Sequence, residues 1–512
     1  MHTPQYWTQQ FSRGDLRRIT QDGTMTYEEC MNEVYDFISQ SSVSANAEED
    51  QTYEQKMESL KQSILLFVTD KKPMVEGYIN RETGKIEYER LSINLIESIT
   101  SYDILTQAMA DPSITEIRIN GLKAIWVERK GRAQLLTDTI TGERVYFKSV
   151  DDCVKMINKL LRFSNAKFGK DAAIANGITV EGFRVAATHQ VCSAADKGTG
   201  QSQDKSPYCV IRKFSDNKFT FKDLVRFKSI GTEMANMFTI LPQADATILV
   251  VGATGSGKTV LVQGLVDRIP GERRLVIIEN PSELRARLYD NEGFMLNDVI
   301  QWEAKDPPPG SDVPSSFPTY SNLMIEALRM SPHYFVFGEL RSDLEFNLAL
   351  TAANTGHHFL TTYHAPSAAD AIDRYVIAVM GASASLPREI VLSRVCQNID
   401  FVLVQEKLND GNRKVMEVAE VVGTEIVDGI LGPKLNMIYV WEPSPDGIQI
   451  NPETGKEYIP GEHYLVGEIS APMAKRLRKA GLTKEQLDMV CRHLGDDRKP
   501  ILCTYNPDGV IV

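Results

Sequence analysis

The stretch ATILVVGATGSGKTVLVQGL, residues 246–265, decides the fold of the central part of this chain. Its apolar run at 247–251 predicts a buried strand, and the residues after Thr259 predict a helix. Between them, residues 252–259 read Gly-x-x-x-x-Gly-Lys-Thr, the P-loop pattern in its required strand–loop–helix setting. Glycines allow the backbone to curl so that its amides converge on phosphate oxygens. The stretch therefore predicts a nucleoside triphosphate site.

We expect the ligands of this site to be ATP and Mg²⁺. Lys258 would reach the terminal phosphates, the Thr259 hydroxyl would ligate the metal, and the start of the helix would add its positive end. The predicted nucleotide-binding residues are Gly252, Ala253, Thr254, Gly255, Ser256, Gly257, Lys258, Thr259 and Val260.

Length and charge restrict the class of protein. A chain of 512 residues is too long for one compact core, so three or four units are expected. The net charge of −12 argues against a general affinity for nucleic acid or an anionic membrane. No apolar stretch approaches the roughly 18 residues of a membrane span, and the first residues lack the apolar core of a signal peptide. We expect a cytoplasmic protein, associated with a membrane only peripherally.

The cysteines indicate neither a disulfide framework nor a zinc cluster. There are seven of them, an odd number, and no two form a Cys-x-x-Cys pair. We therefore interpret them as buried or incidental thiols.

Residues 1–99 predict a helical N-terminal extension. Thr26 to Glu29 form a capping box before a helix that should end near Ser39, and a polar connection follows at 41–51. A second amphipathic helix is indicated by apolar residues at helical spacing, namely Leu60, Ile64, Phe67 and Val68. Packing into a core is the expected role of this apolar face, with docking to a partner as the alternative.

Residues 100–228 predict a small α+β domain with an antiparallel sheet. A helix ends at Asp111, a tight turn at 120–121 joins two strands, and a helix follows at 151–163. Short strands are expected around Arg184 and Arg212, with an exposed loop at 195–207.

Residues 229–428 predict an α/β domain. The short apolar runs TILVV, RLVII, YFVFG, HFLTTY and DFVLVQ alternate with helical patterns, which indicates a mainly parallel sheet covered on both faces. A turn at 409–412 adds a hairpin at the edge of this sheet, and the proline-rich segment 303–318 leaves the core. Residues 429–512 predict a C-terminal appendage of strands followed by helices.

Four side chains at strand ends are candidates for hydrolysis of the bound nucleotide. Glu339 follows the run YFVFG, where its carboxylate could accept a hydrogen bond from the attacking water. Glu279 ends a second apolar run and could orient the magnesium shell or a water. His364 follows a third run and His357 lies at its other end, and a neutral imidazole there could contact the γ-phosphate. The alternatives are non-catalytic roles. Glu339 could be a glutamate exposed to solvent, and either histidine could be a core residue with its hydrogen bonds made within the protein.

These motifs resemble the four ordered boxes of the type II/type IV secretion ATPases, over roughly residues 100–428. The segments are the P-loop, IIENPSEL, ALRMSPHYFVFGELRS and TGHHFLTTYHAPS, and the phrasing is closest to the type IV secretion and Tad-pilus branch. The resemblance implies a RecA-like P-loop core after an α+β N-terminal domain. It also implies a hexameric ATP-hydrolysing motor of a secretion, conjugation or pilus machine, with inner-membrane machine components as partners.

The resemblance assigns roles to individual residues. It implies that Glu339 is the catalytic glutamate, Glu279 the first acid of the acidic box and a metal-site residue, and His364 the histidine-box residue. It also implies that the N-terminal domain donates arginines to the nucleotide, matching Arg184 and Arg212. Arg341 and Arg329 match family positions of less defined role.

One position departs from the family pattern. The acidic box usually reads Glu-Asp, whereas this chain has Asn280 at its second residue, and an amide brings no negative charge to a metal. This position could therefore affect turnover rather than binding.

Three other functions remain open from the sequence, and one of them is a P-loop kinase, for which no acceptor site is identifiable. A nucleic-acid translocase on a similar core would need basic grooves with aromatic side chains, which the acidic composition disfavours. A scaffold that binds nucleotide without hydrolysing it is disfavoured by the presence of Lys258 and Glu339, although Asn280 keeps it open.

Overall fold

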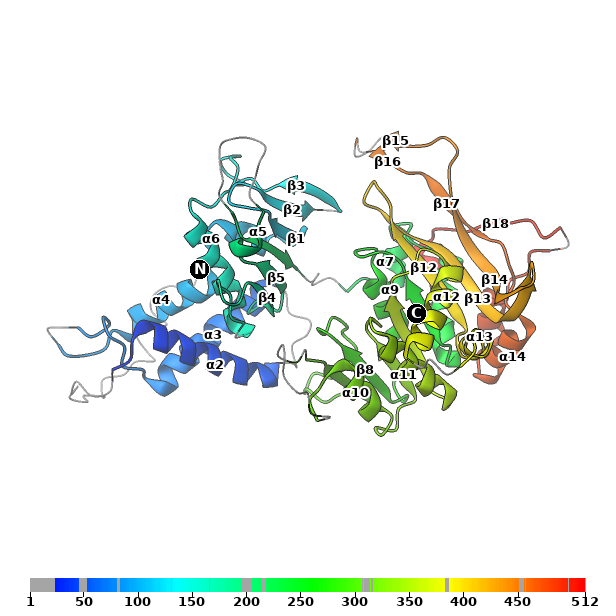
Figure 1. Ribbon diagram of the computed structural model, residues 1–512, viewed down its shortest axis with the longest axis horizontal. Helices are drawn as coiled ribbons and strands as arrows, with labels where there is room; N and C mark the ends of the chain where they lie inside the picture. Colours follow the sequence, from blue (N-terminus) through cyan, green and yellow to red (C-terminus); the bar gives the residue numbers. More distant parts are fainter. Residues whose placement is uncertain are drawn as a thin grey trace. The chain divides into compact units, whose positions relative to one another are not determined.

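The computed structural model describes residues 24–45, 53–80, 83–129, 131–164, 166–194, 205–213, 218–305, 307, 314, 316–382, 386–450, 455, 457–495 and 497–511 (Figure 1). Contacts within the chain divide it into two compact units, residues 1–217 and 218–512, and each is described by itself. The sequence-based division into four parts stays a prediction.

The described part of the first unit begins with three helices, α2 (Tyr27–Ala45), α3 (Tyr53–Lys71) and α4 (Tyr88–Thr100). The capping box is confirmed, because the Glu29 amide donates to Thr26 Oγ1 at 3.2 Å and the Thr26 amide to Glu29 Oε2 at 2.7 Å. The apolar face of α3 is buried in the core shared by the three helices, which confirms the packing role. Helix α2 continues to Ala45, beyond the predicted end. It includes residues 41–45 of the expected connection, and the rest of that connection lies outside the described residues.

The rest of the first unit is an antiparallel sheet with the order β3-β2-β1-β6-β5-β4. Its strands are β1 (Ile114–Ile119), β2 (Ile125–Arg129), β3 (Arg132–Leu135), β4 (Ile174–Ile178), β5 (Arg184–Thr188) and β6 (Tyr208–Arg212). Helix α6 (Val150–Leu161) packs on this sheet through its buried face, and the short α5 (Thr106–Ala110) precedes β1. The predicted combination of helices with an antiparallel sheet is confirmed, and its bounds as a separate domain stay a prediction. Residues 195–204 of the expected loop lie outside the described residues.

The second unit is built on a ten-stranded sheet, of which the described part contains six parallel strands in one continuous block. In spatial order these are β12 (Phe401–Lys407), β7 (Ile248–Val251), β11 (His358–Tyr363), β10 (Tyr334–Phe337), β8 (Leu275–Glu279) and β9 (Val299–Glu303). The five apolar runs are therefore parallel strands, as predicted. Strand β9 escaped the sequence analysis because only its first residue is buried, which leaves little apolar signal.

Four antiparallel strands extend the same sheet beyond β12. They are β13 (Arg413–Val427), β14 (Ile430–Pro443), β17 (Gly461–Leu465) and β18 (Ile501–Leu502), and β15 (Gln449–Ile450) pairs separately with β16 (Glu457–Tyr458). The predicted hairpin exists, with Lys407 opposite Arg413. Its placement at the sheet edge was wrong, because β14 pairs with the other side of β13 after a turn at 428–429.

Helices cover both faces of the sheet, as the alternation of strands and helices predicted. One face carries α7 (Phe221–Arg226), α8 (Thr232–Ile240), α9 (Lys258–Val266), α14 (Ala471–Lys479) and α15 (Lys484–Val490). The other carries α10 (Tyr320–Ala327), α11 (Asp343–Asn354), α12 (Ala368–Ala382) and α13 (Arg388–Asn398). Within β7, Val250 faces the first group, whereas Leu249 and Val251 face the second, because successive side chains alternate across a strand.

Among the described residues, none of the helices combines the length and the apolar character that a membrane crossing requires. Within the proline-rich segment 303–318, which was predicted to leave the core, Glu303 belongs to β9. Residues 306, 308–313 and 315 lie outside the described part of the chain.

Candidate active site

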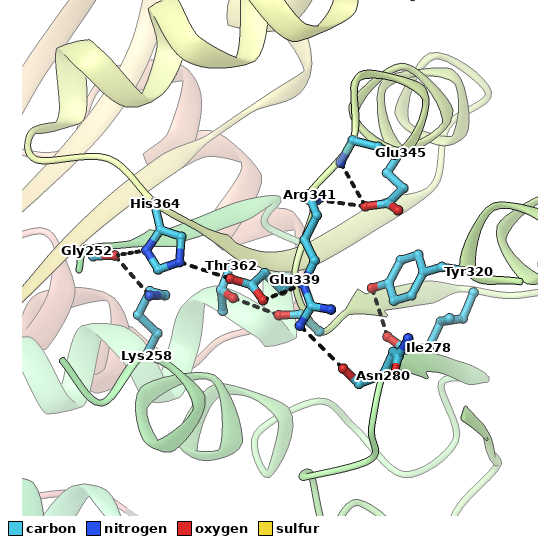
Figure 2. A network of polar contacts seen from close by, with 12 residues as sticks. Gly252, Lys258, Ile278, Asn280, Tyr320, Glu339, Arg341, Glu345, Thr362 and His364 are labelled. Carbon is cyan, nitrogen blue, oxygen red and sulfur yellow. Dashed lines mark hydrogen bonds and ion pairs between the residues drawn. The ribbon is translucent and has the colours of Figure 1, made fainter. Parts of the chain in front are cut away.

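The candidate site lies where four neighbouring parallel strands end. Strands β7, β11, β10 and β8 are adjacent in that order. Gly252 follows β7, His364 follows β11, Glu339 follows β10 and Glu279 ends β8. Because carboxyl ends of parallel strands meet at one edge of a sheet, the three predicted carboxylate and imidazole groups share the edge that carries the glycine-rich loop. Figure 2 shows the polar contacts at this edge.

The conformation of the loop requires its glycines. Gly252, Gly255 and Gly257 have φ angles of +148°, +75° and +96°, in the region that other residues rarely adopt. A Cβ atom on Gly252 would also lie 1.9 Å from the carbonyl oxygen of Gln405. Helix α9 begins directly after Gly257, so its N-terminal end faces the loop.

The inside of the loop carries hydrogen-bond donors that suit phosphate. The Lys258 ammonium is buried and donates to the carbonyl oxygens of Gly252 at 2.9 Å and Ala253 at 3.1 Å. The Ser256 hydroxyl is fully buried and has no hydrogen-bond partner in the described part of the chain. A buried donor without a partner is costly, and a phosphate oxygen would satisfy it. The loop therefore fits a triphosphate, and the partly buried Thr259 hydroxyl suits Mg²⁺.

A chain of contacts links the loop to Glu339. Nδ1 of His364 lies 3.0 Å from the Gly252 carbonyl oxygen, the same atom that Lys258 contacts. Nε2 of His364 lies 3.2 Å from Glu339 Oε1. Both contacts are hydrogen bonds at once only when both ring nitrogens carry hydrogen. Figure 2 shows the imidazole between the loop and the carboxylate.

Arg341 holds the other oxygen of Glu339. Its Nε donates to Glu339 Oε2 at 2.8 Å, and its Nη2 donates to the Asn280 carbonyl oxygen at 3.4 Å. Burial opposes the charge of Arg341, but the hydrogen bond and the negative charge of Glu339 outweigh it and raise the pKa of the guanidinium. The Arg341 amide is fixed in turn by Glu345 Oε2 at 2.7 Å. Glu339 is thus oriented through both of its oxygens.

Glu279 is held differently from Glu339. Its carboxylate accepts hydrogen bonds from the Ser282 hydroxyl and the Gln301 amide, and from the backbone amides of Glu283 and Leu284, at 3.0–3.2 Å. Burial raises its pKa to about 7, against the lowering effect of these hydrogen bonds. The hydrogen bonds described for this carboxylate therefore anchor the 282–284 loop. Its predicted role in the metal or water shell stays a prediction.

A model of the family described as "Type II/IV secretion system protein" matches residues 103–419, more than half of the chain. The chain belongs to this family. The assignment agrees with the phosphate loop, and it makes the chain an ATPase by class.

Individual relatives in this secretion family are distant in sequence. An uncharacterized protein of Methanocaldococcus jannaschii is 29% identical over 48% of this chain and 81% of its own length. The type IV secretion system protein VirB11 of Brucella suis is 28% identical over 41% of this chain and 56% of its own. The X-ray structure of the Yersinia pseudotuberculosis ATPase DotB has 19% identity and a TM-score of 0.42, covering 62% of this chain and 78% of that one. The chain thus spans little more than half of its VirB11 relative.

The two arginines that this secretion-family chain is expected to donate lie in its first unit. Arg184 and Arg212 stand directly opposite each other on β5 and β6, and Glu116 of β1 is opposite Arg212 on its other side. Directly opposite residues share one face of a sheet, and like charges there repel. The structure therefore places the two arginines side by side on the sheet, and their predicted contact with the nucleotide stays a prediction.

Two further predicted residues lie away from the polar network of the strand ends. His357 precedes β11, at the amino end of that strand, where its Nδ1 contacts the Thr355 hydroxyl at 3.0 Å. Arg329 is exposed and pairs with Glu326 at 3.0 Å. The His357 ring therefore makes local hydrogen-bonding contacts, as a histidine with a structural role does.

The sequence analysis missed two residues that contact the loop of this secretion-family ATPase. Gln405 within β12 lies against Gly252, and Arg413 of β13 donates to the Gly255 carbonyl oxygen at 3.0 Å. The hairpin turn predicted that these strands pair, but no local signal indicated that the pair lies beside β7.

Proposed function

We propose that this chain is an ATP-hydrolysing motor of a bacterial type IV secretion, conjugation or pilus machine, and that it works as a homo-hexameric ring. The observation that carries the proposal is the continuous contact from Lys258 through Gly252 and His364 to Glu339. It joins a loop that suits a triphosphate to a carboxylate that suits the attacking water.

In the proposed reaction, the loop amides and Lys258 hold the β- and γ-phosphates of ATP, and the buried Ser256 hydroxyl adds a donor. Magnesium, when bound at Thr259, would supply charge neutralisation at these phosphates. Glu339 accepts a proton from water as the water oxygen bonds to the γ-phosphorus. The bond from that phosphorus to the β–γ bridging oxygen breaks, and ADP and phosphate leave.

His364 and Arg341 orient Glu339 in this scheme, because each contacts one of its two oxygens. The side-by-side Arg184 and Arg212 support a second contribution. Their charges would neutralise a nucleotide when the first unit of this or a neighbouring subunit closes on the site. Force would then pass to the machine by rigid-body motion of that unit.

The proposal places the chain on the cytoplasmic face of the inner membrane, bound peripherally to other components of the machine. The names of relatives such as VirB11 support this class of partner. Nucleic acid is not proposed as a direct ligand, in keeping with the net charge of −12.

The test compares the parent chain with Lys258→Ala, using Lys499→Ala as the control. Lys499 is exposed and pairs only with Asp497 among its described contacts. We expect Mg²⁺-dependent phosphate release and ATP binding in the parent and the control, and loss of both in Lys258→Ala. Mass measurement with ATP present should give a species of about six chain masses. A parent chain that neither binds nor hydrolyses ATP would overturn the proposal, and a fully active monomer would overturn the ring.

A further inference from the structure

A hairpin distant in sequence covers one side of the phosphate loop. Strand β12 runs parallel to β7, with Val404 opposite Val251, and β13 returns antiparallel to β12. This path brings Gln405 and Arg413 beside residues 252–257, about one hundred and fifty residues earlier in the chain.

The hairpin packs so closely against the loop that a side chain at Gly252 or Gly257 would collide with it. A Cβ atom on Gly257 would lie 3.0 Å from Arg413 Cδ and 3.2 Å from Gln405 Nε2. A Cβ atom on Gly252 would lie closer still, 1.9 Å from the carbonyl oxygen of Gln405. The positive-φ turn of the loop is therefore packed directly against the side chains of the hairpin.

Arg413 fixes the orientation of one peptide group in the middle of the loop. Its Nε donates to the Gly255 carbonyl oxygen at 3.0 Å, and the amide of the same peptide, on Ser256, donates to the Ala253 carbonyl oxygen at 3.3 Å. A peptide group is planar, so these two hydrogen bonds together determine where it points. That peptide leads into Ser256, whose buried hydroxyl has no partner among the residues that the structure describes.

The strand that carries Arg413 is itself firmly anchored. The neighbouring Lys414 ammonium donates to the Lys228 carbonyl oxygen at 2.7 Å, and the Val415 amide donates to the Ser229 carbonyl oxygen at 3.0 Å. The buried His463 contacts the Val415 carbonyl oxygen at 3.0 Å. The support of the guanidinium is therefore organised before any ligand binds, which lowers the entropic cost of binding.

A second, independent feature points to a ligand at the same place. The Ser256 hydroxyl is a buried donor with no hydrogen-bond partner in the described part of the chain, and a phosphate oxygen would satisfy it. The buried Gln405 side-chain oxygen has none there either, but as an acceptor it would need a donor group of the ligand or a water. A Cβ atom on Gly252 would lie within 3.0 Å of both the Ser256 hydroxyl and the Gln405 backbone, so both residues border the loop.

We infer that Arg413 is a positioning residue for the nucleotide. It holds the 255–256 peptide in the orientation that phosphate binding needs and adds a positive charge beside Lys258. The inference rests on the proposed function, because it concerns the same loop. Removing Arg413 should therefore weaken the binding of the polyphosphate much more than it slows the chemical step carried out around Glu339.

The experiment measures three variants, Arg413→Ala, Arg413→Lys and the control Arg388→Ala. Arg388 also donates to a backbone carbonyl oxygen, that of Leu431 at 2.7 Å, and pairs with Asp373, in contacts separate from the loop. Kd values for a non-hydrolysable ATP analogue and for ADP are measured by calorimetry at low and high salt, with kcat and KM from phosphate release and Tm from thermal melting.

We expect Arg413→Ala to raise the Kd and KM roughly tenfold while kcat falls less than about threefold. Arg413→Lys should fall between parent and Ala, because it keeps the charge but not the geometry. The control should match the parent. A merely structural role predicts a lower Tm with unchanged Kd.

A Kd for both Arg413 variants within about twofold of the parent would overturn the inference and leave the proposed function intact. If Arg413→Ala does not fold, Arg413→Lys decides the question by the same criterion. A parent chain that does not bind nucleotide would instead overturn the proposed function, which separates the two failures.

Discussion

Nε2 of His364 lies 3.2 Å from Oε1 of Glu339, although the two residues follow different strands. The opposite nitrogen of the same ring lies 3.0 Å from the Gly252 carbonyl oxygen of the phosphate loop. A rigid imidazole therefore spans the distance between the loop and the carboxylate. A movement of the Gly252 carbonyl group on binding phosphate would therefore be transmitted through His364 to Glu339.

Replacing Glu339 by Gln should preserve nucleotide binding and lower turnover by about two to four orders of magnitude. The amide keeps the size of the side chain but cannot accept a proton from water. Phosphate release and ATP-analogue binding, measured on the same sample, check this. Glu326→Gln is the control, since Glu326 pairs with the exposed Arg329. Parental turnover in Glu339→Gln would assign the base to another residue.

Replacing His364 by Ala should lower kcat by roughly tenfold or more, with little change in Kd. The substitution removes the contact that orients Glu339 but leaves the Lys258 ammonium in the loop. Steady-state kinetics together with binding titrations separate the two quantities. An equal loss of affinity and turnover would mean that His364 acts through the loop instead of through the carboxylate.

Replacing Arg184 and Arg212 by Gln, singly and together, should lower turnover while the first unit becomes no less stable. The two arginines stand opposite each other on β5 and β6, and relieving their repulsion offsets the lost contacts. If both arginines contact one phosphate group, the double variant should lose about as much activity as the less active of the two single variants. Unchanged phosphate release in all three variants would remove the arginines from the site.

Replacing Glu279 by Ala should destabilise the second unit by about 2–4 kcal/mol, because donors that are buried or partly buried would lose their acceptor. The donors are the Ser282 hydroxyl, the Gln301 amide and two backbone amides. Chemical denaturation measures this. Glu279→Gln tests the predicted metal role: a raised Mg²⁺ requirement for turnover would support it, and an unchanged requirement would leave only the anchoring role.

Stability should fall with acidification because of His463. Burial, with the nearby Lys414 charge, lowers the pKa of this histidine to about 3 in the folded chain, from about 6.5 when unfolded. Between these values only the unfolded chain binds the proton. The unfolding free energy should therefore drop by up to about 1.4 kcal/mol per pH unit below pH 6.5, with no contribution above pH 7.

His463→Gln should reduce the pH slope of the unfolding free energy even if it lowers stability at neutral pH. The exposed His493, which pairs with Glu468, supplies the control variant His493→Gln. An identical slope in the parent and in His463→Gln would show that another group causes the acid sensitivity.

Local sequence patterns determined a large part of the fold. The loop required glycines at 252, 255 and 257, and all three have positive φ angles. The apolar runs marked five of the parallel strands, since a strand buried on both faces needs a continuous apolar sequence. That Glu339 and His364 share an edge with the loop also followed, because it depends only on the shared direction of parallel strands.

Only the tertiary structure decided the order of the strands and what lies between them. The order β12-β7-β11-β10-β8 puts His364 between Gly252 and Glu339 and brings Arg413 against the loop. Strand β9, with one buried residue, and the strands beyond β13 carried too little periodic signal to be placed. The physical reason is separation along the chain. Periodicity and turn chemistry act between near neighbours in sequence, whereas strand order depends on which surfaces, distant in sequence, bury one another.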